Sequence, residues 1–114
     1  MRASFLLCLA LGLALAACST GSRFDQEAWR NADLTGRARA DMLPDFLERF
    51  PLKGMARSKV IALLGEPTPT DKWDGADMIY VLGNDGSYTG IDHEWLLIDL
   101  DDKQQVASVR TVVD

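Results

Sequence analysis

The chain has 114 residues, 47% of them hydrophobic and 25% charged, which is the composition of one small folded domain. A domain of this size buries a single core and leaves little room for a deep active-site cavity as well. The net charge of −5 argues against a nucleic-acid partner.

The first 17 residues have the features of a secretory leader. Arg2 supplies a positive start, and Phe5–Ala17 is an uncharged apolar run, shorter than the roughly 20 residues that a membrane-spanning helix needs. The run ends in Leu15-Ala16-Ala17-Cys18, which resembles the lipobox of bacterial lipoprotein precursors. We therefore expect residues 1–17 to be a lipoprotein signal peptide, the alternative being an ordinary signal peptide with an incidental cysteine.

The lipobox resemblance implies a lipid anchor at Cys18, which would carry a thioether-linked diacylglycerol and an N-acyl chain. Several acyl chains together hold a small protein on a membrane. In this class an Asp after the cysteine retains the protein at the inner membrane, so Ser19 favours the periplasmic face of the outer membrane. Residues 18–23 would form the lipidated N-terminus and a flexible tether.

Cleavage before Cys18 leaves 97 residues with a formal charge of −6, because Arg2 is lost with the leader. Cys8 and Cys18 are the only cysteines, so the domain at residues 24–114 has no disulfide and no thiol nucleophile. Basic residues concentrate in its first half. They either lie on an ordinary solvated surface or form a basic side that meets anionic lipid head groups. The residues of such a side would be Arg37, Arg39, Arg49, Lys53, Arg57 and Lys59.

Two helices are predicted before residue 51. Phe24–Asp33 can form a short helix with Phe24, Ala28 and Trp29 on one side. Arg37–Phe50 reads as a longer helix, in which Pro44 either produces a kink or starts a second helix at its permitted first position. The apolar residues at helical spacing in this segment are Met42, Leu43, Phe46, Leu47 and Phe50.

A third helix is predicted within Leu52–Pro67. Its core-facing stripe is Ala56, Val60, Leu63 and Leu64. Gly65 and Pro67 provide a doubly specified end. The start is less well defined. Ala56 has no side-chain oxygen to cap the first backbone amides, which costs about 1 kcal/mol of helix stability relative to Ser or Thr.

The remainder predicts strands at Asp77–Leu82, His93–Leu100 and Gln105–Val113. A polar turn at residues 101–104 joins the last two as an antiparallel hairpin. The predicted fold class is therefore α+β, with N-terminal helices followed by a three-stranded antiparallel sheet. The longer connection Gly83–Asp92 is either functional or mobile, and its glycines favour a mobile loop.

Pairing Leu100 with Gln105 predicts the faces of this hairpin. Ile98 would then lie opposite Ala107 and Leu96 opposite Val109 on the core face. On the outer face Trp95 would form a cation–π pair with Arg110, worth roughly 0.5–1 kcal/mol, with Leu97 opposite Ser108 and Asp99 opposite Val106. An apolar patch on a face that alternation should leave polar suggests a protein-binding surface, unless residues 24–33 fold over it. The candidate partner-binding residues are Trp95, Leu97, Val106 and Arg110.

Chemistry-bearing motifs are few. His93 is the only histidine, so a His-based metal cluster is not available. Asp99, Asp101 and Asp102 lack the surrounding twelve-residue loop of a calcium site, and no phosphate-binding glycine loop precedes a helix. We therefore expect no enzyme activity, no metal and no cofactor.

The segment around Gly54 resembles the SmpA/OmlA (BamE-like) domain of outer-membrane lipoproteins. That family shows the pattern G-M-[ST]-x-x-[EQ]-V-x-x-x-L-G-x-P followed by an aromatic-rich strand. The matching residues are Gly54, Met55, Val60, Leu64, Gly65, Pro67 and Tyr80. Ala56 and Lys59 replace the capping-box residues of the pattern, which concerns helix stability rather than fold. The specific part spans roughly residues 50–82, and the longer helical region before it favours a separate lipoprotein with the same domain.

The resemblance implies a fold related to the inhibitor domains that bind β-lactamases. It also implies an accessory role beside the β-barrel assembly machinery, with a partner lipoprotein and phosphatidylglycerol as contacts. We expect a non-catalytic interaction module anchored at the outer membrane. The alternative is an inhibitor of a periplasmic enzyme, with Tyr88 and Ile91 as its insertion residues.

Overall fold

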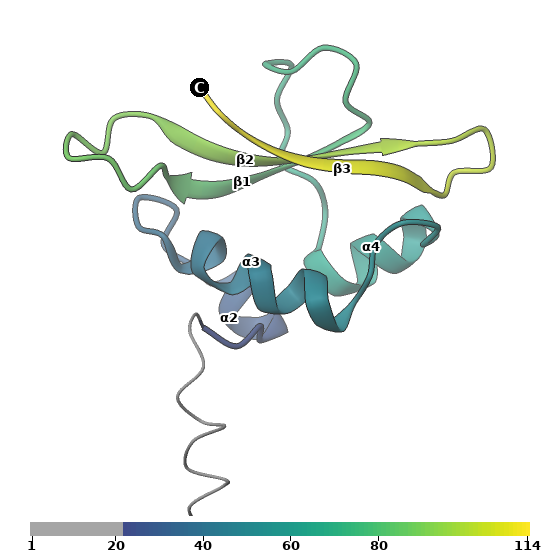
Figure 1. Cartoon of the computed structure of the whole chain (residues 1–114), viewed down its shortest axis with the longest axis horizontal. Helices are drawn as coiled ribbons and strands as arrows, with labels where there is room; N and C mark the ends of the chain where they lie inside the picture. The colour runs from purple at the N-terminus through teal and green to yellow at the C-terminus, as the bar shows by residue number, and fades with distance from the viewer. Residues whose placement is uncertain (1–21) are drawn as a thin grey trace, which may run out of the picture.

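A computed structural model describes residues 22–114, and the predicted leader, lipobox and Cys18 lie outside this range. Three helices precede a three-stranded antiparallel sheet of order β1-β2-β3, so the predicted α+β fold is confirmed. The helices cover one face of the sheet (Figure 1). The elements are α2 (Gln26–Arg30), α3 (Ala38–Arg49), α4 (Arg57–Leu64), β1 (Met78–Asn84), β2 (His93–Leu100) and β3 (Val106–Val113).

Helix α2 is shorter than the predicted Phe24–Asp33. Its start is fixed by Asp25, whose carboxylate accepts the Ala28 N–H at 2.8 Å. Phe24 and Trp29 are buried as predicted, but Ala28 is exposed, so the predicted stripe is wrong at that position. The apolar contact of this segment therefore depends on the two aromatic rings.

Helix α3 runs through Pro44 as one helix, so the alternative of a second helix starting there is wrong. Phe46 is completely buried, and its ring centroid lies 4.7 Å from that of Phe24. Offset and tilted aromatic pairs at such distances add to the energy of area burial. This aromatic cluster holds the start of the described chain on α3.

Helix α4 starts without a side-chain cap, as the sequence predicts. The missing capping interaction is supplied by tertiary structure, because the Arg57 N–H donates to the Gln104 carbonyl at 2.9 Å. Val60 and Leu64 are buried as predicted, whereas Ala56 is exposed, so the predicted stripe is wrong at that position. Gly65 ends the helix at φ +83°, a conformation that favours glycine.

The predicted register of the β2–β3 hairpin is wrong. Leu100 lies opposite Val106 rather than Gln105, and Ile98 lies opposite Val109 rather than Ala107. The register shifts by one residue at the turn, because the Asp101 N–H donates to the Gln105 carbonyl at 2.8 Å and closes a three-residue loop. A bulge after Val106 then shifts the register of the following residues by one more.

The shifted register changes the partner of Arg110. This residue lies opposite Leu97, and its guanidinium binds the Asp99 carboxylate at 2.9 Å. The predicted cation–π pair with Trp95 is therefore wrong. Asp99 itself lies opposite Ser108, not Val106.

The main core lies between the helices and the sheet. From the sheet it receives residues of alternating position on β1 and β2 together with the first residue of β3. These are Met78, Tyr80, Leu82, Leu96, Ile98 and Val106, all buried. The Tyr80 hydroxyl donates to the Gly65 carbonyl at 2.9 Å, which joins the sheet to the end of α4.

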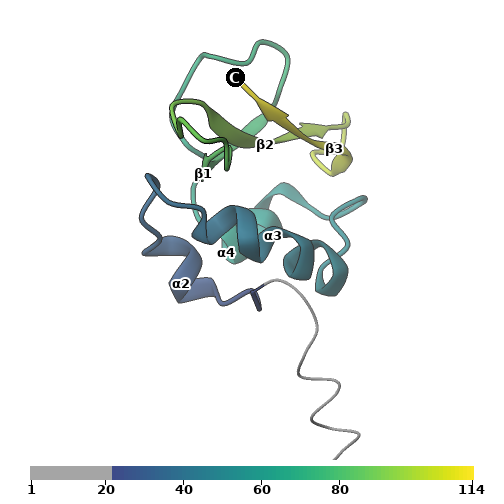
Figure 2. The same cartoon turned by 60° about the vertical axis from the view of Figure 1, so that its left-hand side comes forward.

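The connection between α4 and β1 crosses the opposite face of the sheet (Figure 2). We refer to residues 65–77 as the strap. Thr68 fixes it to β1, because its N–H donates to the Ile79 carbonyl at 2.7 Å and its hydroxyl accepts the Val81 N–H at 3.0 Å. The second face of the sheet is thus covered over β1 and β2, which sequence alternation alone did not predict.

Candidate functional site

The four predicted partner-binding residues do not form a free patch. Val106 belongs to the core on the helix side of the sheet. Leu97 lies on the strap side but is only 1% exposed. Trp95 is partly buried, and Arg110 alone is exposed. The prediction of an exposed apolar face is therefore corrected, because the bulge moves Val106 to the core and the strap covers the part of the other face that holds Leu97.

The strap places a second tryptophan beside Trp95. The ring of Trp73 meets that of Trp95 edge-on, with centroids 6.4 Å apart and an interplanar angle of 69°. Lys72 adds an ion pair to Asp114 at 3.1 Å. The alternative that residues 24–33 cover this face is wrong, since α2 packs on the helical layer on the other side of the sheet (Figure 1).

The six predicted head-group residues divide into two classes. Three arginines join separate segments of the fold: Arg37 pairs with Glu94 at 3.3 Å, Arg39 donates to the Val81 carbonyl at 3.0 Å, and Arg49 donates to the Phe24 carbonyl. Burial lowers the pKa of Arg39. The other three residues, Lys53, Arg57 and Lys59, are exposed in or just before the first turn of α4.

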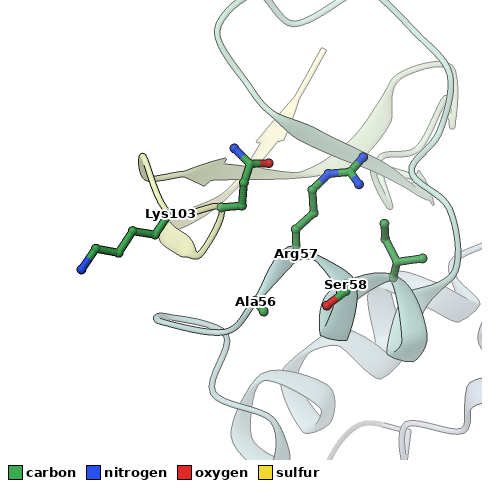
Figure 3. A pocket seen from close by; sticks show the side chains of 6 residues that line it. Ala56, Arg57, Ser58 and Lys103 are labelled. Carbon is green, nitrogen blue, oxygen red and sulfur yellow. The ribbon is translucent and has the colours of Figure 1, made fainter.

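A shallow hollow of about 440 Å³ lies beside the start of α4. It is lined by Ala56, Arg57, Ser58, Ile61, Lys103 and Gln104. The side chain of Arg57 rises toward the sheet, whereas Lys103 points away from it (Figure 3). The two cations therefore do not converge on one point, and this arrangement does not match a site that orients a small molecule with several polar groups.

The end of the molecule at the β1–β2 connection is different. Its loop displays Tyr88, which is fully exposed, and Ile91, which is 73% exposed. The ladder extends into this loop, because the Asp85 N–H donates to the Asp92 carbonyl at 3.0 Å. Asp85 also accepts the Ser87 N–H, and the hydrogen bonds from Ser87 lower the pKa of this carboxyl. The connection Gly83–Asp92 is thus closed by a backbone hydrogen bond between Asp85 and Asp92 and displays two apolar side chains.

Two further exposed apolar residues belong to the same end. Leu34 lies in the α2–α3 connection, which is joined to the hairpin because the Asn84 side chain donates to the Thr35 carbonyl at 2.8 Å. Val113 lies opposite Glu94 at the beginning of β2. We refer to Leu34, Tyr88, Ile91 and Val113 as the apolar tip. Sequence reasoning missed Leu34 and Val113, although a single Leu in the polar segment Asn31–Arg37 was a usable signal.

Carboxylates surround the apolar tip. Asp33, Asp85 and Asp92 lie in the two connections, and Asp114 follows Val113. The pKa of Asp33 is lowered by hydrogen bonds from Thr35, and that of Asp114 by the His93 N–H and Lys72. The nearby cations Arg37 and Lys72 are already paired with acidic residues. This end therefore combines exposed apolar side chains with net negative charge.

The described chain offers no evident chemical centre. Within residues 22–114, no group of three or more His, Cys, Asp or Glu side chains is arranged to hold a metal ion. His93 lies next to Trp95, with ring centroids 6.3 Å apart, and its backbone N–H donates to the Asp114 carboxylate. No helix in the same range is long and apolar enough to span a bilayer.

Comparison with known proteins identifies no relative, because neither a protein family, nor a curated protein, nor a solved structure matches this chain.

Proposed function

We propose that this chain is a lipid-anchored protein of the bacterial envelope whose folded domain binds another protein without catalysing a reaction. The observation that carries the proposal is the apolar tip, above all the exposure of Tyr88 and Ile91 on a connection that a backbone hydrogen bond closes. Exposed apolar groups that gather at one place on a small domain are typical of interaction sites. Tyrosine is also among the residues that contribute most to protein interfaces.

The charge around the apolar tip favours a basic partner. Asp85 and Asp92 flank the exposed side chains, so complementary positive charge would speed association and select among partners. The same carboxylates would be repelled by anionic lipid. For this reason we propose that the apolar tip contacts a protein rather than the membrane.

We further propose that the exposed cations Lys53, Arg57 and Lys59 contact anionic head groups. Their position fits, because the β2–β3 turn that contacts Arg57 lies at the opposite end of β2 from the β1–β2 hairpin. A membrane-facing end and a partner-facing end would then be separate. The anchor at Cys18 and the periplasmic face of the outer membrane belong to this proposal, on the strength of the lipobox sequence Leu15–Cys18.

The resemblance of residues 50–82 to SmpA/OmlA (BamE-like) domains suggests the process. It supports a role in outer-membrane protein assembly or envelope integrity, with the β-barrel assembly machinery as a candidate partner. The order of helices and strands is compatible with that resemblance.

A second candidate function is inhibition of a periplasmic enzyme. The observation that favours it is the position of Tyr88 at the extremity of a hairpin, from which one aromatic side chain could enter a concave active site. Against a purified target enzyme, Tyr88→Ala should then raise the inhibition constant. A Tyr88→Ala protein that inhibits as well as the parent would eliminate this candidate.

The proposed interaction is tested by site-specific photocrosslinking in intact cells. A photoreactive residue at position 88 should capture a defined protein, whereas the same residue at the exposed position 48 on α3 should not. Ile91→Ala should lower the yield from position 88 and leave the free energy of unfolding unchanged within about 0.5 kcal/mol. Equal capture from positions 88 and 48 would contradict the assignment of the interaction to the apolar tip.

The anchor requires a separate experiment. Radiolabelled fatty acid should be incorporated into the parent protein, and Cys18→Ser should abolish the label and release the domain from the membrane fraction. Incorporation that persists in Cys18→Ser would rule out the proposed site of lipidation.

A further inference from the structure

The two edges of the sheet are treated in opposite ways. On β1, the backbone groups that face away from β2 are paired. The Ile79 carbonyl and the Val81 N–H bond to Thr68, and the Val81 carbonyl accepts from Arg39 at 3.0 Å. An exposed strand edge is a template for pairing with another strand, and covering it removes that possibility. The edge at β1 is therefore closed.

The edge at β3 is covered only at its first residue. The Gly54 N–H donates to the Val106 carbonyl, and the Val106 N–H donates to the Met55 carbonyl, both at 2.8 Å. Beyond Val106, no other part of the chain between residues 22 and 114 bonds to the outer edge of β3. Residues 54–55 thus pair with β3 at Val106, and the rest of this edge has no such partner within residues 22–114.

The direction of the remaining backbone groups follows from the ladder. Opposite residues in an antiparallel pair alternate between hydrogen-bonded and non-hydrogen-bonded pairs. The Asp114 N–H donates to the His93 carbonyl at 3.1 Å, which fixes the phase. Counting back along β3 leaves the backbone groups of Val109, Thr111 and Val113 directed outward from the sheet.

We propose that β3 pairs antiparallel with β3 of a second copy of this chain, about a two-fold axis through Thr111. The three outward-facing residues are symmetric about Thr111, so this single register places free donors opposite free acceptors along the whole open edge. Val109 would lie opposite Val113 of the second copy, and Thr111 opposite its own equivalent. The product is one continuous six-stranded sheet with a self-complementary interface.

The side chains along the open edge suit this register. Val109 is partly buried and Val113 is 53% exposed, so their pairing would cover apolar surface. Arg110 would lie opposite Val112 of the second copy, and its charge is already met by Asp99 at 2.9 Å. Natural edges are commonly protected by proline, by lysine or by unpaired inward-facing charges. Between Ala107 and Val113 this strand has no proline and no charged residue besides Arg110.

The experiment uses engineered cysteines in the full chain, purified from membranes in detergent. No cysteine occurs after position 18, so the unsubstituted protein reports any crosslinking that does not come from the introduced thiol. Directly opposite side chains in an antiparallel pair have Cβ atoms about 4.5–5.5 Å apart. Thr111→Cys should therefore give a covalent dimer with a short bismaleimide.

Matched variants test the register. Val113→Cys alone should not crosslink, whereas a mixture of Val113→Cys and Val109→Cys proteins should. Lys103→Cys, on the exposed β2–β3 turn, should give no covalent dimer, although its β3 edge still pairs. A yield of covalent dimer from Val113→Cys alone that equals the yield from Thr111→Cys would overturn the two-fold axis through Thr111.

Hydrogen exchange gives a readout without cysteines. As protein concentration rises, the amides of Val109, Thr111 and Val113 should exchange about tenfold more slowly or better, while that of Arg110 is protected throughout. Thr111→Lys should abolish this concentration dependence, and Thr111→Val should retain it. A monomer at every concentration, with no such protection, would overturn the proposal.

Crosslinking from position 111 to a different envelope protein would likewise overturn self-pairing and assign the edge to a foreign strand. The pairing shares Val113 with the apolar tip but does not involve Tyr88, so Tyr88→Ala should leave it unchanged.

Discussion

The Arg39 guanidinium lies 4.9 Å from the ring centroid of Trp29, and its Nε donates to the Trp29 carbonyl at 2.9 Å. The same side chain donates to the Val81 carbonyl. One residue of α3 therefore connects α2 to β1, although its sequence position suggested only a surface cation. A planar guanidinium donates to two separate carbonyls in fixed directions while its face lies over an aromatic ring, a geometry that the compact ammonium of lysine does not reproduce.

The first prediction concerns this connection. Arg39→Lys should lower the free energy of unfolding by about 2 kcal/mol, because at least one partly buried carbonyl loses its donor. Lys59→Ala, at an exposed position of α4, should stay within about 0.5 kcal/mol of the parent. Urea unfolding followed by tryptophan fluorescence measures both. Equal stability of the parent and Arg39→Lys would show that the two carbonyl contacts contribute little.

The second prediction separates core from surface among the residues first assigned to partner binding. Leu97→Ala should destabilise the domain by about 2–5 kcal/mol, since it leaves a cavity between the sheet and the strap. Arg110→Ala removes an exposed ion pair with Asp99 and should cost at most about 1 kcal/mol. Thermal unfolding of the two variants compares these costs. A mild effect at Leu97 would mean that the strap does not cover this face in solution.

The third prediction uses two glycines with positive φ. A Cβ at Gly83 would lie 2.0 Å from the Gly36 carbonyl oxygen, so Gly83→Ala must displace the α2–α3 connection from β1. We expect a loss of about 3 kcal/mol or more from this overlap. Gly75→Ala meets nothing within 4 Å and should cost only the roughly 1–2 kcal/mol of left-handed strain. If chemical denaturation gives the two variants the same stability, the close approach of residues 36 and 83 is absent.

The fourth prediction concerns pH. Burial raises the pKa of Tyr80 to about 12, whereas an unfolded tyrosine ionises near its ordinary value of 10. Because the pKa is higher in the folded state, the neutral Tyr80 side chain contributes its full stabilisation of the fold below about pH 10. This contribution is lost as pH rises toward 12. The melting temperature of the parent should therefore fall across this window. Tyr80→Phe should begin about 1 kcal/mol less stable, through loss of the bond to Gly65, and show a smaller alkaline decline. Identical alkaline profiles for the two proteins would show that Tyr80 is not the group responsible.

The order of helices and strands was predictable from the sequence because it depends on local patterns. The range of β2 matched the prediction, and Gly65 ended α4 where expected. Such features are set by hydrophobic spacing and by the conformational preferences of single residues. The anchor sequence before residue 19 is equally local, and its function stays a prediction.

The faces of the sheet were not predictable, because they depend on two events outside the strands. Gln104 adopts φ +61° in the turn, and a bulge follows Val106. Every later residue of β3 therefore lies opposite a different residue of β2 from the one predicted. The strap then covers a face that alternation left apolar.

The amino-acid sequence by itself determined the fold class, the element order and the absence of a cysteine after position 18, because each depends on residue type and short spacing. Tertiary structure decided which apolar residues stay exposed and which strand edge stays open. Those properties depend on contacts between segments far apart in the chain, such as Thr68 with Val81 and Asn84 with Thr35, which no local pattern encodes.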